Sequence, residues 1–295
     1  MNSIAVIINS GSGADKSEEK LRQLRGAFTA ADAAPEFFLA HGGETIKIGV
    51  NKALAKGHKI IAAAGGDGTV SAVAAELLGQ PAVLGILPLG TLNHLAKDLG
   101  LPQDLNQAVE TLVTGRVAVI DAGCVNGKYF INNSSIGLYP KLVSLREKHR
   151  ALGKNKFVAL VFALAGMFWR YTFLNVRVQV QGRDISLRSP FVFVGNNKYQ
   201  VEGLNIGTRE KVDNGELSVY VMRHSTRWGV VILAWHALFG GLVEHKDFDV
   251  YSTGHARIDT RKKFLPVSID GEVITLPTPL EYSILPGALK VMVAK

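Results

Sequence analysis

Residues 58–79 read HKIIAAAGGDGTVSAVAAELLG, a short apolar run followed by a glycine-rich turn and then by apolar residues at helical spacing. The run from 60 to 64 predicts a strand buried on both faces, and the residues after Thr69 predict a helix. Gly79, followed by Pro81, predicts the end of that helix. Glycines let the backbone approach an anion, and the amides that open a helix point towards it. The stretch therefore predicts a phosphate-binding loop, with a plain capped turn as the simpler alternative.

Asp67 lies inside this turn, between Gly66 and Gly68. A carboxylate repels a phosphate unless it holds a metal ion or takes part in a proton transfer. Asp67 is therefore a candidate catalytic or metal-binding residue, or else a helix cap.

The first 120 residues alternate strand and helix patterns, which predicts a doubly wound parallel sheet covered on both faces. We expect strands at 3–8, 35–40, 58–64 and 82–87, and helices at about 17–31, 44–56, 69–79, 91–99 and 104–113. Polar or glycine-rich turns at 9–13, 65–69 and 88–93 follow three of the strands. Because such turns gather at the carboxyl edge of a parallel sheet, together they predict a nucleotide phosphate site.

From about residue 116 the chain consists mainly of short β-rich runs, and Asn126-Gly127 is a strong hairpin signal. This texture predicts an antiparallel sandwich or barrel. We expect a nucleotide-binding domain at 1–123, with 286–295 as a candidate returning strand, and a β-rich sandwich domain at 124–285. The active site is expected in the cleft between the two domains.

The 295 residues carry a net charge of +8, and the charge is concentrated. Residues 141–170 hold seven basic residues against one acid and include the apolar run 157–169. This combination favours an anionic membrane surface as partner, with a buried helix beside a solvated loop as the alternative. Nucleic acid is not expected, because the aromatic residues are not interleaved with the charges.

The location predicted is the cytoplasm, with peripheral attachment to the inner face of the membrane. The single cysteine, Cys124, fits a reducing compartment. The opening MNSIAVIINS lacks the basic region of a signal peptide. The apolar stretches 157–169 and 228–243 are both shorter than the roughly 20 residues of a spanning helix.

A second candidate carboxylate, Glu272, follows Asp270-Gly271, which is itself a hairpin signal. Phosphoryl transfer requires positioning, a metal ion and a carboxylate that orients the acceptor hydroxyl or takes its proton, and Asp67 and Glu272 could divide these tasks. Other chemistries are poorly supported. Asp15 disrupts the Walker-like stretch 11–17, and the sequence has neither zinc-type spacing nor a G-x-S-x-G motif.

These residues resemble the diacylglycerol kinase catalytic family, which includes soluble bacterial diacylglycerol and lipid kinases and is related to sphingosine and ceramide kinases. The resemblance spans nearly the whole chain. It rests on GGDGT at 65–69, PLGTLNHLAKDLGLP at 88–102, FINNSSIG at 130–137, VGNNKYQVEG at 194–203 and DGE at 270–272. It implies a lipid-binding role for the β-rich domain, and ATP and Mg²⁺ meeting a lipid hydroxyl in the cleft.

The resemblance also implies roles for individual residues. Glu272 would be the general base, Asp67 would lie near the metal or the acceptor, and Asp121 would support the site. The nucleotide would be held by Asn9, Gly65, Gly66, Asp67, Gly68, Thr69, Ser71, Gly90, Thr91 and Asn93. A further metal site would involve Lys211, Asp213, Asn214 and Glu216.

Four residues depart from the family pattern: Ser71-Ala72 replaces Asn-Glu, Asn214 in Asn214-Gly215 replaces the Asp of Asp-Gly, and Lys97 replaces a frequent arginine. Two other functions stay open at this stage, a soluble-substrate kinase of NAD kinase type and a non-catalytic, nucleotide-binding membrane protein. A homodimer is also left open.

Overall fold

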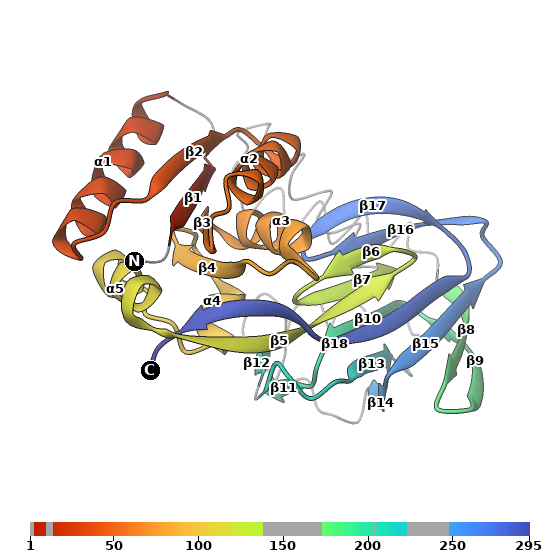
Figure 1. Ribbon diagram of the computed structural model, residues 1–295. Coiled ribbons are helices and arrows are strands. Elements are labelled where there is room, and N and C mark those ends of the chain that lie inside the picture. The colour runs from red at the N-terminus through yellow and green to blue at the C-terminus, as the bar shows by residue number, and fades with distance from the viewer. Residues whose placement is uncertain (1–2, 10–13, 138–172, 203–204, 210, 223–247) are drawn as a thin grey trace, which may run out of the picture. The chain divides into compact units, whose positions relative to one another are not determined.

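The computed structural model describes residues 3–9, 14–137, 173–202, 205–209, 211–222 and 248–295. The chain divides into two compact units (Figure 1). The first unit contains Met1–Ala122, Val212–Asn214 and Leu285–Lys295, and the second contains Gly123–Lys211 and Gly215–Ile284. Each unit is described by itself below.

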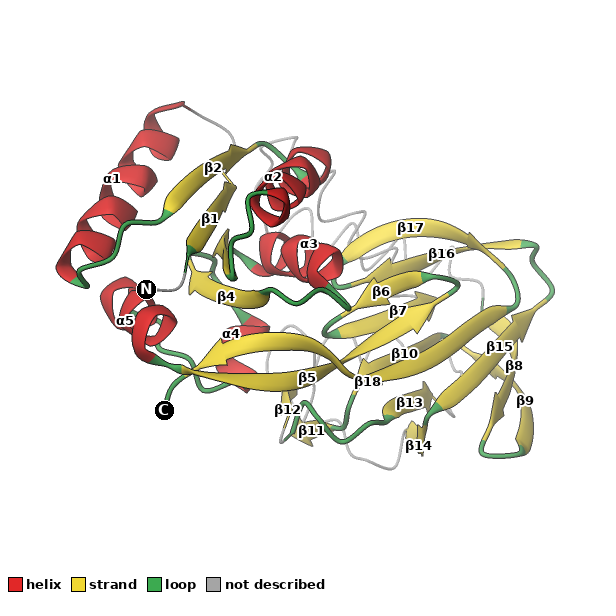
Figure 2. Ribbon diagram, viewed as in Figure 1, coloured by secondary structure: helices red, strands yellow, loops and turns green. Residues whose placement is uncertain are grey.

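The first unit contains a parallel sheet in the order β2-β1-β3-β4, with the end of β18 beside β4. Its strands are β1 (Ile4–Asn9), β2 (Glu36–Ala40), β3 (Ile60–Gly65) and β4 (Val83–Pro88). The helices are α1 (Ala14–Ala30), α2 (Gly43–Ala55), α3 (Asp67–Leu77), α4 (His94–Asp98) and α5 (Leu105–Thr114). All five described helices belong to this unit (Figure 2).

Alternate residues of the central strands face opposite layers of helices. Ile4, Val6 and Ile8 of β1 pack in one cluster with residues of α1 and α5, including Phe28 and Leu112. On the opposite face, α2 approaches β1 and also packs against α3. Because both faces are covered, β1 and β3 are almost wholly apolar, as expected for strands of a doubly wound sheet.

The second unit is a β-sandwich. One sheet has the order β14-β13-β10-β7-β16-β17, and its neighbouring strands with assigned registers are antiparallel. The other layer contains β9, β8, β15 and the beginning of β18. A single hydrophobic cluster contains inward-facing residues of both layers, such as Val178, Val219 and Val267.

The bounds of the remaining strands complete the description. They are β5 (Arg116–Val125), β6 (Lys128–Phe130), β7 (Asn133–Gly137), β8 (Leu174–Val180), β9 (Arg183–Ser189), β10 (Phe191–Asn196), β11 (Tyr199–Glu202), β12 (Asn205–Arg209), β13 (Leu217–Met222), β14 (Phe248–Thr253), β15 (His255–Thr260), β16 (Phe264–Ile269), β17 (Glu272–Pro277) and β18 (Leu280–Val293).

The fold class predicted from the sequence is confirmed, as are the local signals at Gly79, Asn126 and Asp270. Gly79 has a φ of 71° just after α3, and Asn126 and Asp270 each have a φ of 46° in tight turns between paired strands. The helix predicted at 91–99 is only His94–Asp98, because Asn93 adopts a left-handed conformation. The returning strand expected at 286–295 is the later part of one long strand, β18, which begins at Leu280 and ends at Val293.

Several sequence predictions lie outside the described residues. They include the basic segment 141–170 and the apolar stretches 157–169 and 228–243. Among the helices that are described, none has the length and apolar character needed to cross a membrane.

Candidate active site

Two loops at the carboxyl edge of the first unit's sheet touch each other. The first glycine loop, residues 65–69, follows β3, and the second glycine loop, residues 88–93, follows β4. A Cβ atom added at Gly90 would lie 2.5 Å from the Cα of Gly66, and the Leu89 amide donates to the Gly65 carbonyl at 3.0 Å. Only glycine permits this approach, so the two loops form one continuous backbone surface.

The carboxylate of Asp67 joins the two loops. One oxygen, Oδ2, accepts from the Asn93 amide at 3.0 Å, and the other, Oδ1, accepts from the His94 amide at 2.6 Å. These amides lie at the N-terminus of α4. Asp67, although far away in the sequence, therefore supplies the acceptor that an N-cap residue would provide. Hydrogen bonds to a charged group are worth about 1.5–3 kcal/mol each. The helix-cap interpretation thus holds in part, but the helix that Asp67 caps is α4, not its own.

Asn93 organises the second glycine loop from inside. It is a buried residue with φ and ψ both at 50°. Its side chain accepts from the Gly90 amide at 3.1 Å and donates to the Gly90 carbonyl at 3.0 Å. The same amide group donates to Gln103 Oε1 at 3.1 Å. Sequence reasoning missed Gln103, because nothing in its local pattern marks a contact with a turn ten residues earlier.

Asn9 and Thr69 link the end of β1 to the first glycine loop. Asn9 Nδ2 donates to Thr69 Oγ1 at 3.1 Å, and Thr69 is buried. A Cβ at Gly65 would lie only 2.4 Å from Thr69 Oγ1, so this glycine is required for the threonine to sit against the strand. The first amides of a helix lack an intrahelical acceptor. In α3 the Thr69 and Val70 amides donate to the Gly66 carbonyl at 2.9 and 3.1 Å, so the amides that point to a phosphate site are the two before them.

Three further predicted residues differ in their surroundings. Thr91 is exposed, and a Cβ at Gly68 would meet nothing within 4 Å, so both positions are open to a ligand. Ser71 is partly buried on α3, and its hydroxyl has no hydrogen-bond partner. Ser71 and the two loops belong to the same unit, so the predicted nucleotide residues lie around one edge of its sheet.

Asp121 is buried in β5, where it stabilises other parts of the first unit. Its Oδ1 accepts from the Gly287 amide at 2.9 Å, and its own amide donates to the Val212 carbonyl at 2.9 Å. Gly287 has a φ of 63° inside β18. The Asp121 side chain therefore holds the point where the long last strand passes through a left-handed residue.

Glu272 is the exposed first residue of β17, in the second unit. The turn before it is fixed by Asp270, whose carboxylate accepts from the amides of Ile131, Asn132 and Asn133 at 2.8, 2.8 and 3.0 Å. Sequence analysis assigned no such role to Asp270. The sequence shows that Asp270 belongs to a hairpin motif, but it does not show that its partners are amides far away in the chain.

A buried arginine binds acceptor groups of the same segment, residues 131–133. Arg209 is only 3% exposed, and its guanidinium donates to the carbonyl of Ile131 at 2.7 Å and to Asn132 Oδ1 at 3.2 Å. It also lies 5.5 Å from the centre of the Tyr199 ring. Arg209 and Asp270 together give the Glu272 turn a rigid support.

The predicted additional metal site lies between β12 and β13. Lys211, Asp213 and Asn214 are exposed, and the carbonyl of Glu216 accepts from the Asn197 amide at 2.9 Å. Within the described part of the chain, no group of three or more histidine, cysteine, aspartate and glutamate side chains could hold a metal ion. A metal at these four residues stays a prediction.

Asp67 suits a magnesium ion better. Each of its oxygens accepts one hydrogen bond from a backbone amide and keeps further lone pairs. Mg²⁺ commonly binds one or two carboxylates together with the phosphates of a substrate. Asp67 between two open loops therefore fits such an ion.

Comparison with known proteins identifies both halves of the chain. A family model described as the diacylglycerol kinase catalytic domain matches residues 3–125. A second, described as the YegS C-terminal NAD kinase beta sandwich-like domain, matches residues 146–293.

Individual relatives agree with these matches. The diacylglycerol kinase of Bacillus subtilis is 32% identical over 218 residues, which is 72% of this chain and 71% of that protein. A probable lipid kinase YegS-like protein of Pectobacterium atrosepticum is 30% identical over 184 residues, covering 59% of this chain and 60% of that protein. A solved structure of a putative diacylglycerol kinase from Bacillus anthracis has the same fold, with a TM-score of 0.75 at 22% identity over 99% of this chain and 97% of that one.

Proposed function

The chain belongs to the diacylglycerol kinase catalytic family, and we propose that it transfers the γ-phosphoryl group of ATP to a hydroxyl of diacylglycerol or a related membrane lipid. The observation that carries this proposal is the direct contact of the two glycine loops, joined by Asp67, at the carboxyl edge of a parallel sheet. A bare backbone surface of this kind suits the phosphates of a nucleotide.

Each residue then has a chemical task. Amides of the two glycine loops hold the phosphates, and Asp67 holds Mg²⁺, which when bound would neutralise charge on the β- and γ-phosphates. Glu272 takes the proton of the lipid hydroxyl as its oxygen bonds to the γ-phosphorus, while the bond to the β-phosphate oxygen breaks and ADP leaves. This scheme requires Glu272 and Asp67 to meet across a cleft between the two domains, and that meeting is part of the proposal.

The membrane is the proposed source of the substrate. The cationic segment 141–170 would attract anionic lipids on the cytoplasmic face. Peripheral attachment at that face, the domain limits given above, a homodimer and the additional metal site at 211–216 also remain proposals.

The decisive experiment supplies purified protein with radiolabelled ATP, Mg²⁺ and diacylglycerol in mixed micelles, with NAD as the competing acceptor. We test NAD because the second matching family model is described as NAD kinase beta sandwich-like. Labelled phosphatidic acid is the expected product. Labelling of NAD alone would assign a soluble substrate, and no labelled product from any lipid extract would favour a non-catalytic nucleotide-binding protein.

Glu272→Gln tests the general base, because Glu272 is exposed and its replacement leaves Asp270 in place. We expect kcat to fall by about 100-fold or more, with the ATP affinity unchanged. An undiminished rate in Glu272→Gln would remove Glu272 from the mechanism.

A further inference from the structure

A short basic turn in the second unit ends in an exposed aromatic residue. The basic turn, residues 261–263, reads Arg-Lys-Lys and connects β15 to β16, and Phe264 begins β16. All four residues are exposed. Phe264 is 62% exposed, the highest value among the large hydrophobic residues of the described part of the chain. Cations and an exposed aromatic side chain are thus presented at one point.

The backbone of the basic turn is held in place. The Lys262 amide donates to Thr260 Oγ1 at 3.2 Å, and the Thr278 amide donates to the Lys263 carbonyl at 3.0 Å. The Thr278 hydroxyl also donates to the Lys262 carbonyl. The cationic side chains therefore extend from an ordered loop, which lowers the entropy lost on binding.

Two prolines extend the apolar surface beside Phe264. Pro277 is paired with Phe264 across the β16–β17 ladder, and Pro266 lies two residues further on the same face of β16. Both prolines are exposed. Phe264 therefore belongs to a small apolar patch at this end of the hairpin.

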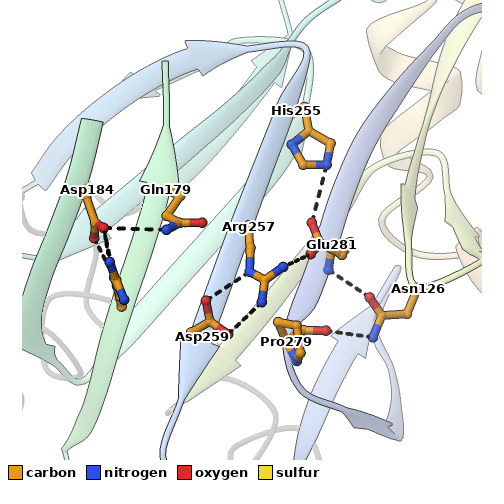
Figure 3. Close-up of polar contacts among 9 residues, drawn as sticks. Asn126, Gln179, Asp184, His255, Arg257, Asp259, Pro279 and Glu281 are labelled. Atoms are coloured by element: carbon orange, nitrogen blue, oxygen red, sulfur yellow. Dashed lines mark hydrogen bonds and ion pairs between the residues drawn. The ribbon is translucent and has the colours of Figure 1, made fainter. Parts of the chain in front are cut away.

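Two arginines on the neighbouring sheet are each paired with carboxylates, unlike the cations of the basic turn. Figure 3 shows Arg257 between Asp259 and Glu281, with bonds of 3.0 and 2.8 Å. Arg177 is likewise paired with Asp184 at 2.8 Å. In the regions that the structure describes, no ion pair involves the three cations of the basic turn. Their charge is thus available to an external anion.

We propose that the basic turn and Phe264 dock the second unit on the surface of an anionic lipid bilayer. The three cations contact the lipid headgroups, and Phe264 inserts at the boundary with the acyl chains. A single exposed aromatic residue beside consecutive cations fits a bilayer better than a nucleic acid, which uses aromatic platforms spaced along the charged groove. The inference rests on the proposed function for its biological role, but its test needs neither ATP nor substrate.

The proposed docking point is separated from the proposed catalytic carboxylate. The basic turn precedes β16, and Glu272 follows the turn at its other end. β16 has six residues, which span roughly 20 Å at about 3.4 Å per residue. Changes in the basic turn should therefore leave Glu272 undisturbed.

The test measures sedimentation with vesicles of phosphatidylcholine alone or with phosphatidylglycerol added. Wild type should prefer the anionic vesicles, and the preference should weaken with salt. Each cation near an anionic surface is worth about fivefold in affinity, so R261Q/K262Q/K263Q should bind on the order of 100-fold more weakly. The matched control K52Q/K59Q/K128Q removes three exposed cations elsewhere and should bind nearly as wild type does.

Phe264 gives a second readout that does not depend on net charge. In a Cys124→Ser background, Phe264→Cys carrying an environment-sensitive dye should shift its emission to the blue on anionic vesicles. The inference is overturned if the turn variant binds anionic vesicles as tightly as wild type does, or if wild type shows no preference for anionic vesicles. It is also overturned if the dye's emission does not shift when anionic vesicles are added. Loss of DNA retention in the turn variant, without vesicle binding by wild type, would assign the turn to nucleic acid. Kinase activity on a detergent-dispersed short-chain diacylglycerol should be unchanged in the turn variant, so failure of either proposal is distinguishable from failure of the other.

Discussion

Replacing Gly90 by alanine is expected to push the two glycine loops apart. The new Cβ would lie 2.5 Å from Gly66 Cα and 2.7 Å from Asn93 Oδ1. Ordinary carbon contacts begin at about 3.5 Å, so the loops must separate by roughly 1 Å. Overpacking of this size costs about 1–3 kcal/mol of folding free energy. A misplacement of about 1 Å in a catalytic site can cost roughly 100-fold in rate.

The assay compares three alanine variants by thermal melting, ATP binding and initial rate. Gly90→Ala should lower both the Tm and the ATP affinity. Gly68→Ala should keep its Tm, because its Cβ would meet nothing within 4 Å, yet it should weaken ATP binding if phosphates lie over the loop. Gly26→Ala, exposed on α1 with equally open space, is the control: its Tm should not fall, because alanine favours a helix over glycine, and its ATP affinity should be unchanged.

A particular pattern of results would refute this reasoning. If Gly90→Ala has the same Tm and the same ATP affinity as wild type, the close approach of the two loops is not required. If Gly68→Ala and Gly26→Ala both bind ATP normally while Gly90→Ala only loses stability, the contact supports the fold and the phosphates bind elsewhere.

Three further predictions concern polar groups outside the glycine loops. Asp270→Asn leaves one of the amides of 131–133 without its acceptor, so kcat should fall while the ATP affinity stays near wild type, as rate and binding measurements would show. Tyr282 is fully buried, its raised pKa keeps the phenol protonated, and its hydroxyl lies 3.1 Å from Ser134 Oγ. Tyr282→Phe should therefore destabilise the second unit by about 1–3 kcal/mol in urea unfolding. Hydrogen bonds from Lys56 and then His58 hold the pKa of Glu36 below its ordinary value of 4.5. The stability that this adds is present above the ordinary pKa and is lost as the pH falls through the lowered one, so Glu36→Gln and wild type should differ slightly in urea at neutral pH and converge in acid.

Much of the fold could be predicted because its signals are local. β3 is an uninterrupted run of small and apolar residues, and a strand buried on both faces requires such a run. Asn126 and Asp270 precede glycines, and both pairs adopt the positive φ angles that tight hairpins need. These outcomes depend on neighbours in sequence, so one sequence was sufficient.

The organisation of the candidate site depends on contacts between residues that are distant in sequence, and these contacts could not be predicted. Asp67 was recognised as unusual, but its amide partners lie 26 and 27 positions later, where the sheet brings β3 and β4 together. The start of α4 was expected too early, at residue 91, for the same reason, because Asn93 is left-handed and its amide bonds to Asp67. The returning strand was expected to begin at residue 286, whereas β18 begins at Leu280 and continues through Gly287, whose amide donates to the buried carboxylate of Asp121.

The position of β18 in the sequence also affects the order in which the protein can be made. β4 ends at Pro88, but its partner residue Val291 is added roughly 200 positions later. At about 5–20 residues per second, a ribosome needs on the order of ten to forty seconds to close that gap. Throughout this time the backbone edge of β4 lacks the strand that finally covers it, and such edges recruit other chains. A nascent chain of this protein therefore has an uncovered β4 edge, open to pairing with other chains, for much of its synthesis. In a fragment ending at Ala122 that edge would stay uncovered permanently.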